Sequence, residues 1–164
     1  MNAFEFAMKM EMDGKTFYEE QAAKADLPEL KNLLLELASD EQKHYNLFKG
    51  MAEGKVVTYP EAQKTKIVAS IKNIFETLKA QNPDFEFPGD AGRAWEEARE
   101  VEKKSEAFYR QKAEETADDG QKLVWHRIAD EERKHWQSIE NVIQFLSHPK
   151  TWLADAEWHQ LEDL

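Results

Sequence analysis

Apolar residues recur at spacings of three and four along four long stretches of the chain. This is the pattern of helices that bury one face. The stretches cover residues 2–24, 28–53, 92–116 and 121–147. Gly and Pro residues cluster mainly at the junctions between them, where helices end. The pattern therefore predicts four long helices.

Residues 55–91 separate the second stretch from the third and have a different pattern. Within them, residues 61–80 favour a short helix. Its apolar side would carry Ile67, Ile71, Ile74, Phe75 and Leu78. We interpret residues 55–91 as a long connection with its own helix, and we expect a short amphipathic helix over residues 151–164.

The chain repeats its own pattern at an offset of 91 residues, so that residues 2–53 match 93–144 without a gap. Two helical hairpins with the same plan, facing each other, make a four-helix bundle. The connection between the second and third helices must then cross the length of the bundle, which explains why it is long. The sequence predicts an all-α fold with one domain over residues 1–164.

Four glutamates and two histidines interrupt the apolar faces of these helices. They are Glu11, Glu41, His44, Glu102, Glu132 and His135. In the second and fourth helices the Glu and the His are three residues apart, which places both on one face. Burying an unpaired carboxylate costs on the order of several kcal/mol, so the core must contain something that compensates it.

A pair of metal ions would provide that compensation. One Glu from each of two helices, with a Glu-x-x-His pair from each of the other two, is the ligand set of di-iron and di-manganese carboxylate bundles. Four carboxylates balance two divalent cations, and neutral imidazoles add ligands without charge. We expect Glu41 and Glu132 to bridge the ions. Oxygen and nitrogen ligands suit iron, manganese or zinc, so the ligands alone do not choose the metal.

A single Glu-x-x-His pair is more often a solvated helix surface than a metal site. Two such pairs at buried positions, each with a partner Glu at the matching repeat position, favour the metal interpretation. The alternative is a buried polar network without a metal.

Several neighbours of these residues have two interpretations. Tyr18 and Tyr109 lie two helical turns beyond the first and third glutamates, where they either donate hydrogen bonds to ligand carboxylates or serve as core aromatics. Glu106 is either an additional ligand or a surface residue. Gly14 and Ser105 leave room near the metals, or reflect tight packing. We expect no ligand among the remaining histidines, which are His126, His148 and His159.

Charge and composition exclude several classes of function. The net charge is −11, which disfavours nucleic acids and anionic membranes as partners. No cysteine is present, which excludes thiolate zinc sites, iron–sulfur clusters and rubredoxin-type iron centres within this sequence. The sequence shows no signal-peptide pattern and no stretch as long as a membrane span, so we expect a cytoplasmic protein.

Four short motifs resemble those of the rubrerythrin family of ferritin-like proteins. They are E-M-D-G-K-T-F-Y at 11–18, D-E-Q-K-H at 40–44, E-K-K-S-E-A-F-Y at 102–109 and E-E-R-K-H at 131–135. The resemblance implies a ferritin-like bundle with a non-haem di-iron centre. It also implies a reaction with hydrogen peroxide or dioxygen, often in protection against oxidative stress.

The chain departs from rubrerythrins proper in two ways. Without cysteines it has no rubredoxin-like domain, so it resembles the short branch of the family, and any electron donor would be a separate protein. Rubrerythrins proper also carry a further glutamate ligand three residues after the position of Glu102, where this chain has Ser105. Glu106 is an uncertain substitute for it.

Three functions share this ligand set. The leading one is an oxidoreductase that reduces peroxide or dioxygen with electrons from a donor protein. The alternative is an iron-handling protein that acts as a ferroxidase, store or delivery agent. The third is a structural dimer held by its metal. Apolar residues in the tail and the connection lead us to expect a homodimer.

Overall fold

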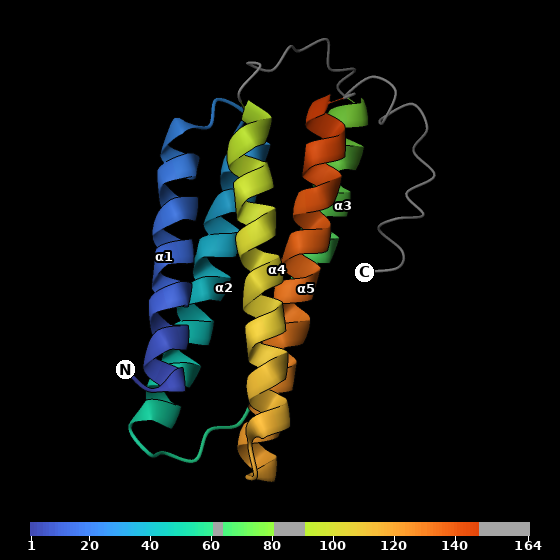
Figure 1. Ribbon diagram of the computed structural model, residues 1–164. Coiled ribbons are helices and arrows are strands. Elements are labelled where there is room, and N and C mark those ends of the chain that lie inside the picture. The colour runs from blue at the N-terminus through green and yellow to red at the C-terminus, as the bar shows by residue number, and fades with distance from the viewer. Residues whose placement is uncertain (61–63, 81–90, 148–164) are drawn as a thin grey trace.

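The computed structural model describes residues 1–60, 64–80 and 91–147. This part of the chain forms five helices and no strand, as the sequence predicts (Figure 1). The helices are α1 (Ala3–Lys24), α2 (Pro28–Ala52), α3 (Ile67–Ala80), α4 (Ala91–Glu115) and α5 (Asp119–Ser147). The all-α fold class is confirmed.

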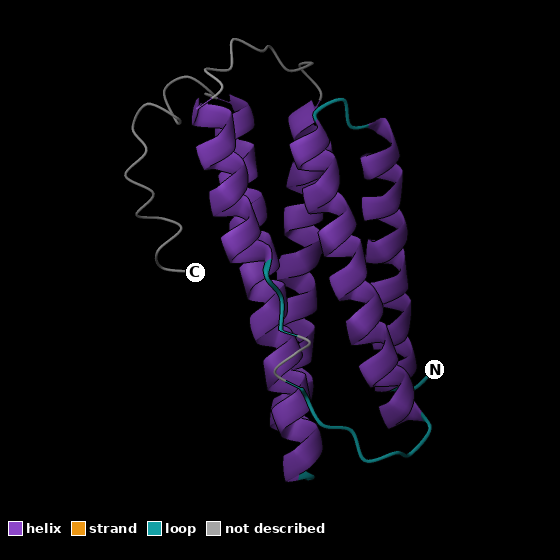
Figure 2. Cartoon of the chain, turned by 180° about the vertical axis from the view of Figure 1, so that it is seen from behind, coloured by secondary structure: helices purple, strands orange, loops and turns teal. Residues whose placement is uncertain are grey.

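Two antiparallel hairpins build the bundle. Helix α1 packs along α2, and α4 packs along α5. Helices α2 and α4 run in the same direction, because α2 ends at one end of the bundle and α4 begins at the other (Figure 1). The chain between them therefore returns along the bundle, as Figure 2 shows from behind.

Local signals fix where the first hairpin begins and ends. Asn2 and Glu5 form a capping box, in which the Asn2 side chain accepts from the Glu5 N–H at 2.9 Å and the Glu5 carboxylate accepts from the Asn2 N–H at 3.2 Å. Such a cap contributes about 1 kcal/mol. Pro28 occupies the first turn of α2, and Gly54 follows the end of α2 with a φ of +75°, a conformation that favours glycine.

The apolar core is divided into two clusters by a polar layer. One cluster contains Leu34 and Leu37 of α2, with Ile139 of α5. The other contains Phe48 of α2 and Trp125 of α5. Along each long helix the candidate ligands lie between these two clusters, so apolar packing above and below holds the polar layer in place.

Helix α3 covers the side of the bundle where α2 and α5 meet. It packs against both of these helices, and its Ile67, Ile71 and Phe75 side chains are completely buried. The rings of Phe75 and Phe145 lie 5.1 Å apart. The predicted apolar side of this helix therefore faces the core, although the side chain of Leu78 lies outside what the structure describes.

The predicted start of this helix, near residue 61, is wrong, because α3 begins at Ile67. Residues 61–63 lie outside the described part of the chain. At Thr65 the backbone N–H donates to the Glu131 carboxylate at 2.7 Å, and the hydroxyl accepts from the Ile67 N–H at 3.2 Å. Thr65 therefore precedes the helix, and its hydroxyl accepts from the N–H of the first helical residue.

The short helix expected over residues 151–164 lies outside the described residues, and the single-domain assignment over residues 1–164 stays a prediction. Among the helices that the structure describes, none combines the length and the apolar character that crossing a bilayer requires.

Candidate metal centre

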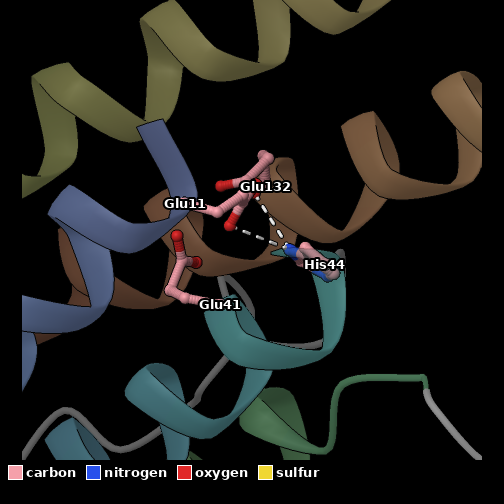
Figure 3. Close-up of side chains that lie close together, drawn as sticks. All are labelled: Glu11, Glu41, His44 and Glu132. Atoms are coloured by element: carbon pink, nitrogen blue, oxygen red, sulfur yellow. Dashed lines mark hydrogen bonds and ion pairs between the residues drawn. The ribbon is translucent and has the colours of Figure 1, made fainter. Parts of the chain in front are cut away.

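The six residues selected from the sequence meet in the polar layer of the bundle. They are Glu11 of α1, Glu41 and His44 of α2, Glu102 of α4, and Glu132 and His135 of α5. Each is at most 3% exposed. Figure 3 shows four of them, with side chains from α1, α2 and α5 pointing toward one another.

These side chains form two overlapping groups. One consists of Glu11, Glu41, His44 and Glu132; the other consists of Glu41, Glu102, Glu132 and His135. Within each group the ligand atoms lie within 4.8 Å of one another. Glu41 and Glu132 belong to both groups, which is the arrangement expected of carboxylates that bridge two ions.

The donor atoms themselves fit a pair of cations. Four buried carboxylate oxygens, one each from Glu11, Glu41, Glu102 and Glu132, have no hydrogen-bond partner, and neither has His135 Nδ1. Leaving a buried charged group without a partner is costly. Divalent cations would satisfy these atoms together, because each oxygen or imidazole nitrogen is a ligand for iron, manganese or zinc.

Both imidazoles turn their Nδ1 atoms toward the glutamates. His44 Nδ1 lies 3.4 Å from Glu11 Oε2 and 3.2 Å from Glu132 Oε1 (Figure 3). His135 Nδ1 lies 3.3 Å from Glu41 Oε1. The two rings stack with their centroids 5.8 Å apart. The Nδ1 atoms are therefore the nitrogens placed to bind metal.

Two tyrosines hold carboxylates of the opposite repeat. The Tyr18 hydroxyl donates to Glu102 Oε1 at 2.5 Å, and the Tyr109 hydroxyl donates to Glu11 Oε1 at 2.7 Å. Both tyrosines thus donate hydrogen bonds to candidate ligands, and both also belong to the apolar clusters. Burial raises the pKa of each tyrosine well above its ordinary value, and the neighbouring carboxylates raise it further. Both hydroxyls therefore keep their protons and remain donors.

Protonation carries the compensating charge when no cation is bound. Burial raises the pKa of Glu41 well above its ordinary value, and the charges of Glu102 and Glu11 raise it further. Burial alone lowers the pKa of His135, but its hydrogen bond to Asp40 and the nearby glutamates raise it well above the ordinary value. Protons thus gather where cations would bind, and metal binding must displace them.

On the His44 side of the cluster, burial and neighbouring charges also act on the pKa values in opposite directions. Burial lowers the pKa of His44, but the Glu11 carboxylate more than offsets this and raises it. In return, burial raises the pKa of Glu11, but the positive charge of His44, with the hydrogen bond from Tyr109, more than offsets this and brings it below its ordinary value. The contact between His44 Nδ1 and Glu11 Oε2 therefore favours the charged form of each group.

Sequence reasoning missed two buried carboxylates beside the cluster. Asp40 and Glu131 directly precede the shared glutamates and occupy equivalent positions in the repeat. They are 3% and 2% exposed. Asp40 Oδ2 lies 3.0 Å from His135 Nε2, which is the ring nitrogen turned away from the glutamates. A carboxylate there fixes the orientation of the ring and makes it a better ligand.

Glu131 is held differently, by the connection that precedes α3. Its Oε1 atom accepts from the Tyr59 hydroxyl and from the Thr65 N–H. The Thr65 hydroxyl donates to Asp40 Oδ2. Thr65 of the connection therefore bonds both Asp40 and Glu131, which we call the outer carboxylates of the two repeats.

The repeat itself contained a signal for these two carboxylates, because an acidic residue precedes the shared glutamate in both halves. That position lies to one side of the buried stripe and looks like solvated helix surface. It is buried because the connection passes over it, and the path of the connection could not be read from the helical pattern.

Other candidates lie away from the cluster. The Glu106 carboxylate accepts from Arg110 Nε at 2.7 Å and from Trp136 Nε1 at 2.8 Å, and it belongs to neither ligand group. The proposed additional ligand is therefore not brought to the site. His126 is half-buried and also belongs to neither group. His148 and His159 lie outside the described residues.

Comparison with known proteins identifies one family. The family model described as rubrerythrin matches residues 2–143, which include all six clustered side chains. No curated protein and no solved structure matches the chain.

Proposed function

This chain belongs to the rubrerythrin family, and from that premise we propose that it is a di-iron oxidoreductase. It reduces hydrogen peroxide or dioxygen with electrons from a separate donor protein. The observation that carries the proposal is the pair of overlapping ligand groups, in which buried carboxylate oxygens have no hydrogen-bond partner.

In this proposal each residue has a separate role. Glu41 and Glu132, which belong to both ligand groups, would be shared between the ions, while Glu11 with His44 and Glu102 with His135 would complete the two ends. When bound, two iron ions supply the two electrons that reduce an O–O bond. The four carboxylates would hold the ions in both oxidation states.

The residues around the candidate ligands fix their orientation and exclude bulk water. Tyr18 and Tyr109 each hold one oxygen of an end glutamate and leave the other free to bind metal. Asp40 holds the far nitrogen of His135. The apolar clusters above and below the layer exclude bulk water, which strengthens the electrostatic interactions inside.

The direct test is anaerobic loading with ferrous iron, followed by stopped-flow absorption after mixing with peroxide or dioxygen. We expect a stoichiometry of two irons per chain and rapid oxidation, followed by recovery of the ferrous state when a reductant is added. Glu132→Ala should abolish both, and Glu106→Ala, outside the cluster, should retain them. A loaded protein that does not react with either oxidant would rule the proposal out.

The alternative, an iron-handling protein, uses the same ligands and differs in the fate of the iron after loading. It predicts uptake beyond two irons per chain or transfer of iron to an acceptor, without repeated reduction of peroxide. The same experiment therefore distinguishes the two functions when iron is added in excess and several additions of peroxide are made.

Three further features belong to the proposal. The donor is a separate protein because this sequence has no cysteine with which to build a rubredoxin-like centre. A homodimer and a cytoplasmic location stay predictions. Light scattering tests the first, and a monomeric mass would refute it. Fractionation of the cells that make the protein tests the second.

A further inference from the structure

A cavity of about 170 Å³ lies between α1 and α4. Its outer end is lined by exposed residues, among them Val101, which is 52% exposed. Its inner end is lined by the buried carboxylates of Glu41 and Glu102. The cavity therefore leads from the surface of the bundle to two of the candidate ligands.

The repeat leaves space at this place. Gly14 and Ser105 occupy equivalent positions, 91 residues apart, and both line the cavity. A Cβ atom at Gly14 would lie 2.7 Å from Glu41 Oε2, which is closer than nonbonded atoms approach. Glycine thus lets the Glu41 carboxylate lie against α1, and no large side chain fills the space beside it.

The opposite side of the bundle is closed. There α3 packs against α2 and α5 (Figure 1), and Thr65 bonds the outer carboxylates of both helices. Within the described residues, no comparable helix packs over α1 and α4. The two sides of one polar layer therefore differ in access.

The chemistry of the wall defines what the cavity admits. Met10, Phe17, Ala98 and Val101 supply apolar surface. None of the described residues that line it is Lys, Arg or His, while Glu97 stands at its outer end. Apart from Tyr18 and Ser105, an anion would meet acidic residues and apolar surface, whereas a small uncharged molecule meets no such electrostatic barrier.

A second cavity, of about 310 Å³, has the opposite character. It is lined by Arg110, Arg127, Arg133 and Lys134, with Tyr59 and Glu131. It is the larger of the two, but none of the six candidate ligands lines it. By size alone, this cavity would be the candidate for access to the metal centre. The smaller cavity is the better candidate, because candidate ligands line it.

We propose that the cavity between α1 and α4 is the path by which a small uncharged oxidant reaches the candidate metal centre. This inference rests on the proposed function. It adds that the oxidant arrives as a neutral molecule of a few heavy atoms, such as hydrogen peroxide or dioxygen, and that Val101 and Ala98 determine how large it can be.

The test uses two matched variants. Val101→Trp adds a large side chain at the outer end of the cavity. Leu123→Trp makes the same change at a position of nearly equal exposure, 53% against 52%, on α5 and outside the lining of the cavity. Ala98→Leu fills the cavity from within, in case the tryptophan turns toward solvent. Circular dichroism checks that all three fold.

Xenon gives the first measurement, and it needs neither metal nor turnover. Apolar cavities of about 150 Å³ bind xenon. Crystals of the metal-free protein under xenon pressure should show a xenon peak between α1 and α4. The peak should persist in Leu123→Trp and disappear in Val101→Trp or Ala98→Leu. Absence of the peak from the unaltered protein overturns the proposal.

The second measurement is the rate of oxidation of the ferrous, loaded protein. A blocked path should lower the bimolecular rate constant for hydrogen peroxide by about tenfold or more, with unchanged iron content, while Leu123→Trp reacts like the unaltered protein. tert-Butyl hydroperoxide should react more slowly than hydrogen peroxide. Equal rates in a variant that excludes xenon would overturn the path, whereas an unaltered protein that reacts with no oxidant would overturn the proposed function instead.

Discussion

The two repeats supply the same ligands but support them unequally. The His135 ring is held at Nε2 by Asp40, at 3.0 Å, which leaves its Nδ1 facing Glu41 Oε1 at 3.3 Å. In the other repeat, the residue equivalent to Asp40 is Glu131, and its Oε1 atom is engaged by Tyr59 and Thr65 of the connection. The shorter side chain bonds the opposite histidine, and the longer one bonds the connection.

The comparison shows which contacts are the same in both repeats and which differ because of the connection. The inner layer is nearly symmetric, because Tyr18 and Tyr109 make matching bonds to the glutamates. Asymmetry enters from the connection, which passes over only one side of the bundle. We therefore expect the two metal positions to differ in affinity, with the His135 position the stronger.

The largest expected effect comes from removing a ligand that the two positions share. Glu132→Ala deletes a carboxylate that belongs to both ligand groups, so metal content should fall from two ions to none. Glu11→Ala deletes a carboxylate of one group only and should leave the His135 position occupied. Metal analysis after gel filtration measures both. Equal losses of metal in the two variants would mean that Glu132 is not shared between two metal positions.

Next in size is the effect of the outer carboxylates. Removing a partner that orients a metal-bound histidine typically costs about 10- to 100-fold in affinity. Asp40→Asn should therefore lower the metal affinity of the position beside His135 by that factor. Glu131→Gln should lower the affinity of the position beside His44 by less, because Glu131 bonds residues of the connection. Competition between the protein and a chromophoric chelator for cobalt gives both constants, and a larger loss in Glu131→Gln would reverse the comparison.

The pH dependence of stability comes third. In the metal-free fold the pKa values of His44, His135 and Glu41 are raised, so the folded state binds more protons than the unfolded state and stability falls as pH rises. The histidines contribute fully below about pH 6.5, the ordinary value, and their contribution is lost as pH rises through the folded values.

Urea denaturation of the metal-free protein between pH 6 and pH 9 should show this decline. Metal affinity should change in the opposite direction, because each bound cation displaces protons and binding strengthens as pH rises. Stability of the metal-free protein that increases over this range would contradict the assigned shifts.

The last prediction concerns the tyrosines, whose removal should affect the stability of the fold. Tyr18→Phe and Tyr109→Phe each remove one hydrogen bond to a buried carboxylate, at a cost of about 1.5–3 kcal/mol in the free energy of unfolding. Because the two bonds are equivalent in the repeat, the two costs should be similar. Denaturant unfolding measures them, and Tyr45→Phe, at a half-buried residue outside the cluster, is the control.

Much of this organisation could be predicted from the sequence, for identifiable reasons. Glu41 and His44 interrupt an apolar stripe three residues apart, which no surface helix requires, and the 91-residue offset relates them to Glu132 and His135. Helical periodicity also gave the four long helices to within a few residues. These features depend on local spacing, which the sequence states directly.

The features that could not be predicted depend on the path of the connection. Thr65 lies outside any helix and has no periodic neighbour, yet it bonds two carboxylates from different helices. The helical pattern indicates a surface position for Asp40, but the connection covers this residue. Glu106 was a reasonable candidate by spacing, but Arg110 and Trp136 hold it elsewhere. Each of these contacts depends on how side chains meet in space, and no local pattern records them.

The most direct test of the central claim is an anomalous diffraction map of the iron-loaded protein, collected at the iron absorption edge. Two peaks are predicted in the polar layer, one beside Glu11 and His44 and one beside Glu102 and His135, with Glu41 and Glu132 in contact with both. A map with no peak among these six side chains, or with iron bound only at the surface, would contradict the account.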